Sequence, residues 1–264
     1  MTLETRVAIA AAEAGAAVIR SMYGAPVARY DKSATDFATE ADLESERAIK
    51  ATVRAAFPDD AFLGEEGGLD GPPDAARTWL VDPLCGTLNF AATTPLMGVN
   101  VALRERGQVT AAAVVDPFAG ETLWTDGITV RVRTADGERE PEPSALTRLV
   151  DVDFDGNPAW AASVVGSPGF TPRFGIRVVS TSLAAAWVAT GRRAAYLQIG
   201  DVRDSVHFAA PIAVCRSAGC IVTGLRGEPV GDGPDGLLIA ADSATHEALV
   251  AVLRDLGEVS APRR

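Results

Sequence analysis

Apolar residues near the start of the chain recur at the spacing of a helix face. Between residues 2 and 22 they fall at intervals of three and four, and Gly24-Ala25-Pro26 then ends the pattern. A second helix is predicted to begin near Thr39 or Asp42 and to end at Pro58. These two segments predict a pair of amphipathic helices joined by a polar loop.

Short apolar runs bounded by turn residues predict strands in the rest of the first half. Turn signals between the last three runs predict an antiparallel meander. The predicted strands are residues 61–64, 78–81, 97–103, 109–115 and 121–125.

The stretch 135–144, rich in Pro, Glu and Gly, is the predicted boundary between an N-terminal part, residues 1–140, and a C-terminal part, residues 141–264. Beyond it, helix and strand patterns alternate, which predicts an α/β (α+β) protein. Helices are predicted at residues 182–190, 205–218 and 245–256, and strands at residues 195–198 and 237–241.

The composition narrows the classes of partner. The chain has 264 residues, 47% of them hydrophobic, which suits one large domain or two tightly joined ones. No apolar run approaches the roughly 18 residues that span a bilayer, and the first residues do not resemble a secretory signal. A formal net charge of −11 argues against nucleic acid and membrane partners. The 3 cysteines form no disulfide pattern, which favours a cytoplasmic setting.

Two carboxylates stand where a cation site is expected. Glu65 and Asp82 each follow a predicted strand, and Asp82 is followed by Pro83 and then by a Gly86-Thr87 turn. Carboxylate, carbonyl and hydroxyl oxygens are the ligands that hard divalent cations prefer. Two strand ends directed at one loop therefore favour a shared cation.

The segment Asp82-Pro83-Leu84-Cys85-Gly86-Thr87-Leu88-Asn89-Phe90 resembles the metal loop of the inositol monophosphatase family, Asp-Pro-(Ile/Leu)-Asp-Gly-Thr-x-Asn-Phe. Other segments are similar to the family's motifs and occur in the same order. They are Asp36–Asp42, Gly64-Glu65-Glu66, Ser180-Thr181-Ser182, Val206–Ala210 and Ser217–Cys220.

The resemblance implies the layered α-β-α-β-α sandwich of the inositol monophosphatase and fructose-bisphosphatase type. The N-terminal α+β half, residues 1–140, would carry the metal loop. The C-terminal α/β half, residues 141–264, would complete the pocket, with the site in the cleft between the halves. The resemblance also implies a homodimer and a small phosphorylated substrate.

The resemblance further assigns a first Mg²⁺ ion to Glu65, Asp82, the Leu84 carbonyl and Thr87. In the family this ion assists hydrolysis of a phosphomonoester, and Glu65 with Thr87 would orient the attacking water. All of these residue types are present in this chain.

A further ion of the family shares Asp82 and uses two more carboxylates, whose places are taken here by Cys85 and His207. Because Mg²⁺ prefers oxygen ligands and octahedral geometry, this half of the site is expected to bind it poorly. We therefore expect a single, weakly bound Mg²⁺ or none, and impaired two-metal phosphatase chemistry.

Three interpretations of Cys85 and His207 stay open. The pair is the remnant of a degenerate, non-catalytic site, or it forms a thiol–imidazole or soft-metal site for another reaction, or it leaves a working single-metal phosphatase. If the family geometry holds, both side chains converge on Asp82. Two opposing effects would then act on the thiol: an imidazolium neighbour lowers its pKa, whereas Asp82 and Glu65 raise it if no metal neutralises them. A bound cation would therefore favour partial ionisation near neutral pH, and Cys85 is expected to be alkylated faster than Cys215 and Cys220.

Candidate substrate contacts come from several loops. By the resemblance they are Lys32, Gly86, Ser180, Thr181, Ser182 and Asp204. Lys32 is predicted to lie at the pocket rim. Asp204 has two interpretations: it replaces the missing carboxylate near Asp82, or it caps the following helix, a place that Ser205 also suits.

Overall fold

The computed structural model describes residues 1–33, 36–232 and 236–256. Two residues of the polar loop after the first helix, and the end of the predicted C-terminal part, lie outside this range. The chain forms two compact units. The first contains residues 1–140, 181–183 and 206–214, and the second contains residues 141–180, 184–205 and 215–264.

The first unit is built on an eight-stranded sheet in the order β10-β9-β8-β7-β6-β5-β3-β4. All neighbours in this sheet are antiparallel except β3 and β5. The strands are β3 (Ala61–Gly64), β4 (Gly68–Asp70), β5 (Arg77–Cys85), β6 (Gly98–Glu105), β7 (Gln108–Asp116), β8 (Glu121–Thr125), β9 (Val130–Thr134) and β10 (Gly137–Arg139). The predicted meander is therefore present, and β9 and β10 extend it.

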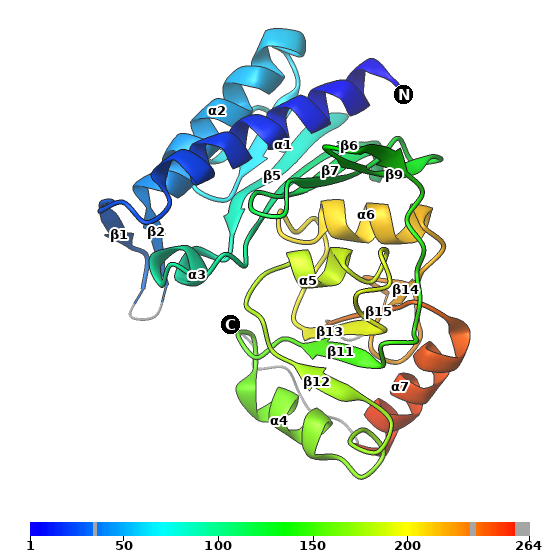
Figure 1. Cartoon of the computed structure of the whole chain (residues 1–264). Helices are drawn as coiled ribbons and strands as arrows, with labels where there is room; N and C mark the ends of the chain where they lie inside the picture. The colour runs from blue at the N-terminus through cyan, green and yellow to red at the C-terminus, as the bar shows by residue number, and fades with distance from the viewer. Residues whose placement is uncertain (34–35, 233–235, 257–264) are drawn as a thin grey trace. The chain divides into compact units, whose positions relative to one another are not determined.

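Two long helices lie side by side against this sheet (Figure 1). Helix α1 (Leu3–Met22) packs on α2 (Glu40–Ala56) and against β6, β7 and β8. Of the two predicted starts, near Thr39 or near Asp42, helix α2 has the first. The Asp42 carboxylate accepts the Thr39 backbone N–H and so closes a capping box. Strands β1 (Arg29–Asp31) and β2 (Phe37–Thr39) form a separate hairpin, and α3 (Thr87–Ala91) follows β5.

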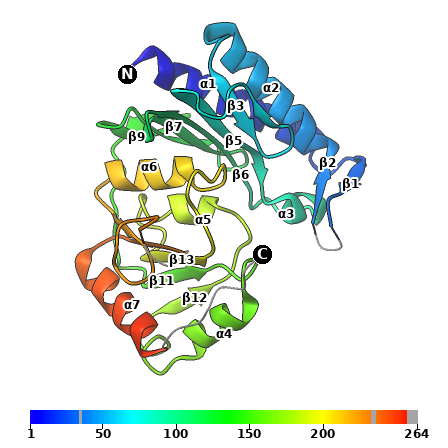
Figure 2. The ribbon, with the colours of Figure 1, turned by 180° about the vertical axis from the view of Figure 1, so that it is seen from behind.

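The second unit holds a five-stranded mixed sheet in the order β12-β11-β13-β15-β14, whose strands are labelled in Figure 1. Figure 2 shows β11, β12 and β13 from behind. Strand β11 is parallel to both of its neighbours, and β15 is antiparallel to both of its own. Its elements are β11 (Leu149–Val152), α4 (Pro158–Gly166), β12 (Gly175–Arg177), β13 (Ala195–Ile199), β14 (Ile221–Thr223), β15 (Gly236–Ala240) and α7 (Ser243–Asp255).

Two predicted helices are shorter in the structure. The helix expected at residues 182–190 is α5 (Leu183–Ala186), continued by tighter turns to Gly191. The helix expected at residues 205–218 is α6 (Ala209–Ser217). Neither Asp204 nor Ser205 is its N-cap, because the helix begins only at Ala209. In the part of the chain that the structure describes, no helix is long and apolar enough to cross a membrane.

Candidate functional site

The loop that follows Asp82 has a constrained backbone. Asp82 lies within β5, and the pairing of β5 with β6 becomes irregular between Asp82 and Cys85. Gly86 then adopts a φ of 121°, and a Cβ atom at this position would lie 2.9 Å from the Leu96 carbonyl oxygen. Only glycine fits here without strain, and the turn at this glycine leads directly into α3.

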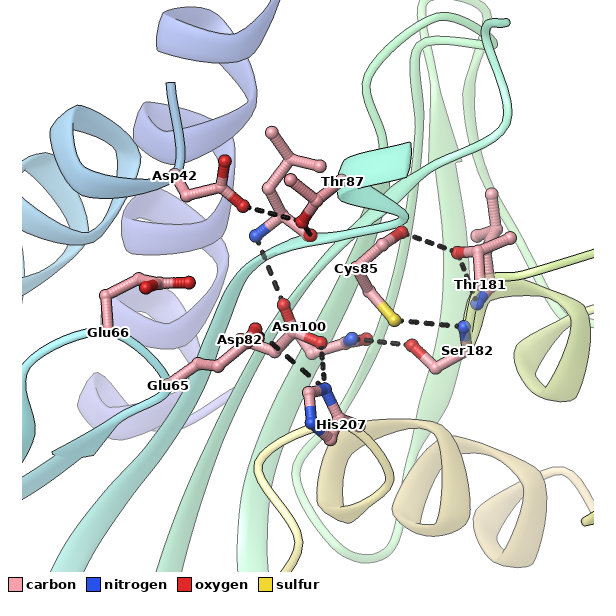
Figure 3. A network of polar contacts seen from close by, with 12 residues as sticks. Asp42, Glu65, Glu66, Asp82, Cys85, Thr87, Asn100, Thr181, Ser182 and His207 are labelled. Carbon is pink, nitrogen blue, oxygen red and sulfur yellow. Dashed lines mark hydrogen bonds and ion pairs between the residues drawn. The ribbon is translucent and has the colours of Figure 1, made fainter. Parts of the chain in front are cut away.

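Asp82 is the buried centre of a polar network (Figure 3). Its side chain is 0% exposed, and its Oδ1 atom accepts the backbone N–H of Leu84 at 3.1 Å. Its Oδ2 atom lies 2.6 Å from Nδ1 of His207. Burial opposes ionisation, but the charge and hydrogen bond of His207 outweigh it and lower the pKa of Asp82.

Cys85 occupies the end of β5 beside Asp82. Its sulfur accepts the backbone N–H of Ser182 at 3.1 Å, and its carbonyl oxygen accepts the Thr181 hydroxyl at 2.7 Å. Burial and the negative charge of Asp82 raise the pKa of the Cys85 thiol to about 11. Of the two opposing effects, burial beside Asp82 therefore outweighs the imidazole in the metal-free protein.

His207 reaches this network from the segment that leads into α6. Its side chain is 42% exposed, and Nδ1 also lies 4.0 Å from Oε2 of Glu65. Burial lowers the pKa of His207, but the contact with Asp82 prevails and raises it to about 12. His207 is therefore an imidazolium paired with a carboxylate. The ligand atoms of Asp82, Cys85 and His207 all lie within 4.8 Å of one another.

Glu65 follows β3 and links this network to Lys32. The Lys32 ammonium lies 3.2 Å from Glu65 and 2.7 Å from Glu66. Burial and the nearby Asp82 raise the pKa of Glu65 to about 8. Glu46 of α2 holds the turn after β3, because its carboxylate accepts the backbone N–H groups of Glu66 and Gly67, each at 2.8 Å.

Thr87 contacts Asp42, a residue that the sequence analysis did not single out as part of the site. Its hydroxyl donates to Oδ1 of Asp42 at 2.8 Å and lies 3.3 Å from the Leu84 carbonyl oxygen. Asp42 is fully buried, and burial raises its pKa against the hydrogen bonds from Thr39 and Thr87. The sequence contains the capping pattern Thr39-x-x-Asp42, which could have drawn attention to Asp42. It does not show that the other carboxylate oxygen of Asp42 contacts Thr87.

The residues predicted to contact substrate are divided between the two units. Thr181 and Ser182 belong to the first unit and hold the Cys85 loop, and the Ser182 hydroxyl also accepts the Asn100 amide at 2.8 Å. Ser180 belongs to the second unit and donates to the Asp155 carboxylate. Asp204 is exposed and also belongs to the second unit; it is His207 that lies beside Asp82.

Comparison with known proteins identifies the class. The profile of the Inositol monophosphatase family matches residues 2–258, so the chain belongs to this family, and the expected resemblance is confirmed. The chain is 33% identical over 206 residues to an "Inositol-1-monophosphatase" of Caulobacter vibrioides, covering 73% of this chain and 77% of that protein. It is 31% identical to a "Nus factor SuhB" of Pseudomonas aeruginosa, covering 83% of each.

Solved structures show the same fold. The SuhB protein of Bartonella henselae superposes with a TM-score of 0.83 at 23% identity, covering 94% of this chain and 97% of that one. A protein named SaIMPase-II, solved with inositol monophosphate bound, gives a TM-score of 0.69 at 20% identity, covering 94% of this chain and 92% of that one. The mixed α/β fold of the inositol monophosphatase type is thereby confirmed.

Proposed function

We propose that this protein binds a small phosphorylated metabolite at the Asp82 site and hydrolyses it poorly with Mg²⁺. The contact between Nδ1 of His207 and Oδ2 of Asp82, at 2.6 Å, carries this proposal. A two-metal phosphatase shares such a carboxylate between its ions. Here one oxygen of that carboxylate already faces an imidazolium, and the other accepts a backbone N–H group.

The residues present suit one hard cation. Glu65, Asp82, the Leu84 carbonyl and Thr87 offer only oxygen, and the pKa of Glu65 is raised by burial and then by repulsion from the charge of Asp82. A divalent cation would relieve that repulsion, so we propose that these residues hold one Mg²⁺ weakly. When bound, the ion would neutralise phosphate charge and activate a water molecule. Glu65 and Thr87 are then placed to orient that water.

The other half of the site does not suit Mg²⁺. Cys85 offers sulfur and His207 offers nitrogen, where the resemblance expects carboxylates, and Mg²⁺ dehydrates only for oxygen ligands in regular geometry. Assistance to the leaving oxygen by a further Mg²⁺ is therefore lost. The family relationship supports a phosphorylated small-molecule ligand, and the altered half-site supports slow turnover.

A panel of sugar and inositol phosphates tests both parts. Binding, seen by calorimetry or as a raised melting temperature with Mg²⁺, is expected for at least one compound, with phosphate release far below about 1 per second. The double variant Cys85→Asp with His207→Asp is expected to release phosphate faster, because it restores two carboxylates. Turnover in the ordinary range of about 1–1000 per second by the unmodified protein would contradict the proposal.

A different reaction that uses Cys85 and His207 is the second candidate. The proximity of their ligand atoms to Asp82 favours it, whereas the raised pKa of the thiol in the metal-free protein disfavours a free thiolate nucleophile. We also propose a cytoplasmic homodimer. The unpaired thiols of Cys85, Cys215 and Cys220 suit a reducing compartment, and dimerisation rests on the family resemblance alone.

A further inference from the structure

Three side chains of different chemistry meet at the end of β5. Asp82 offers oxygen, Cys85 sulfur and His207 nitrogen, and the ligand atoms lie within 4.8 Å of one another. Thiolate and imidazole ligands select Zn²⁺ and related transition metals, whereas Mg²⁺ is selected by oxygen alone. The two replacements that spoil this half-site for Mg²⁺ are thus the ones that suit a softer metal.

We propose that Asp82, Cys85 and His207 form a binding site for one borderline-soft divalent metal ion, with Zn²⁺ as the best fit. Tetrahedral zinc with bonds of about 2.0–2.3 Å keeps its ligand atoms about 3.3–3.7 Å apart. The present separation of 2.6 Å between Asp82 and His207 would have to open by about 1 Å. His207 is half-exposed and lies just before α6, so its ring has room for that change.

Neighbouring groups orient the ligands as outer-shell partners do in metal sites. The Ser182 N–H group donates to the Cys85 sulfur at 3.1 Å, and the Leu84 N–H group donates to Oδ1 of Asp82, which leaves Oδ2 for a metal. Asn100, the β6 neighbour of Asp82, fixes the Ser182 hydroxyl at 2.8 Å. Such partners raise metal affinity because they set the direction of each donor atom.

Asn100 supplies a further observation. Its side chain is fully buried, and its Oδ1 atom has no hydrogen-bond partner in the part of the chain that the structure describes. A buried amide oxygen without a partner costs free energy, and the usual remedy is a water molecule or another bound group. A hydrated metal ion beside Asp82 would supply one.

The fourth ligand position has two candidate occupants. Oε2 of Glu65 lies 4.0 Å from Nδ1 of His207, and the exposed side of His207 admits water. Three protein ligands with an open position are typical of catalytic rather than structural zinc. This inference goes beyond the phosphorylated ligand proposed above, and it stands even if no phosphate ester binds.

Cobalt(II) is the probe, because its complexes with thiolate absorb in the near ultraviolet and report sulfur ligation directly. Chelator-treated protein is titrated with Co²⁺ and then with Zn²⁺, with no phosphate compound present. One equivalent of Co²⁺ with a thiolate band, displaced by one equivalent of Zn²⁺, is expected. Cys85→Ser should abolish the band, and His207→Ala should weaken binding by more than about 100-fold.

The double variant Cys215→Ser with Cys220→Ser is the matched control and should keep the band. Thermal unfolding in chelator shows whether each variant is folded, and X-ray absorption of the unmodified zinc protein counts sulfur ligands without any substitution. A thiolate band that survives in Cys85→Ser, or no sulfur around zinc, would overturn the inference. Because phosphate plays no part in this assay, its outcome is separate from that of the hydrolysis experiments.

Discussion

Nδ1 of His207 lies 2.6 Å from Oδ2 of Asp82, although the two residues are 125 positions apart in the chain. The contact ties the segment before α6 to strand β5, the end of which carries Asp82 and Cys85. It also places the positive charge of the imidazolium beside a carboxylate that a bound metal ion would otherwise neutralise. The stability of the site and its affinity for cations are therefore linked through one ion pair.

The alkaline pH dependence of stability should report this pair. The pKa of His207 rises to about 12 in the folded protein, above its ordinary value, so the stabilisation is complete below about pH 6.5 and is lost as the pH rises toward 12. Lys32, Cys85 and Glu65 face the same network, and Glu65 titrates near pH 8.

The comparison of His207 with its variant is therefore made in a Glu65→Gln background with chelator. Between about pH 8 and pH 10 the melting temperature should fall more steeply with His207 present than in a His207→Gln variant. Parallel curves would contradict the ion pair.

Mg²⁺ is predicted to bind once and weakly. Calorimetry should give a stoichiometry near one, and Glu65→Gln should weaken binding by at least about tenfold because it removes a charged ligand. Glu44→Gln, on the exposed face of α2 beside Arg47, is the control and should bind as the unmodified protein does. Two Mg²⁺ ions per chain would show that Cys85 and His207 do not impair the second position.

Cys85 should react with iodoacetamide slowly at neutral pH in the metal-free protein. Its pKa of about 11 predicts that the alkylation rate rises about tenfold per pH unit between about pH 7 and pH 10. Mass spectrometry distinguishes Cys85 from Cys215, which is fully buried and should label more slowly still. A rate that is already constant near pH 7 would show an activated thiolate and favour the Cys85–His207 catalyst.

Gly86→Ala should destabilise the protein by more than about 2 kcal/mol, since alanine avoids a φ of 121° and its Cβ would meet the Leu96 carbonyl. Gly107→Ala is the matched control: Gly107 also has a positive φ, of 82°, but a Cβ there meets nothing within 4 Å. It should cost about 1 kcal/mol. Urea unfolding measures both, and equal losses would mean that the Leu96 contact relaxes freely.

Asp42→Ala should cost about 2–4 kcal/mol of stability, because it removes the buried carboxylate that pairs with Thr39 in the capping box of α2 and accepts the Thr87 hydroxyl. Asp242→Ala removes the exposed cap of α7 and should cost about 0.5–2 kcal/mol. Only the Asp42 variant should also weaken Mg²⁺ binding in calorimetry, since Thr87 loses its orientation. An unchanged affinity would limit Asp42 to its capping role.

Much of the local structure followed from the order of residues. Apolar spacing predicted α1 and α2, and the capping residue types placed the start of α2 near Thr39 or Asp42, because capping depends on neighbours in the chain. The motif around Asp82 identified the family, because all of its residues belong to one short turn and can be recognised from consecutive positions. Helix α5 was overestimated, because apolar spacing does not distinguish a helix from tighter turns in a buried segment.

The chemistry of the site was decided by tertiary structure. No local pattern shows that His207, rather than Asp204, lies beside Asp82, or that the Ser182 N–H group meets the Cys85 sulfur. The motif left the thiol between an imidazole that lowers its pKa and carboxylates that raise it, and burial next to Asp82 keeps it protonated without a metal. A pKa depends on the charges and solvent around a group in space, and those surroundings come from segments far apart in the sequence.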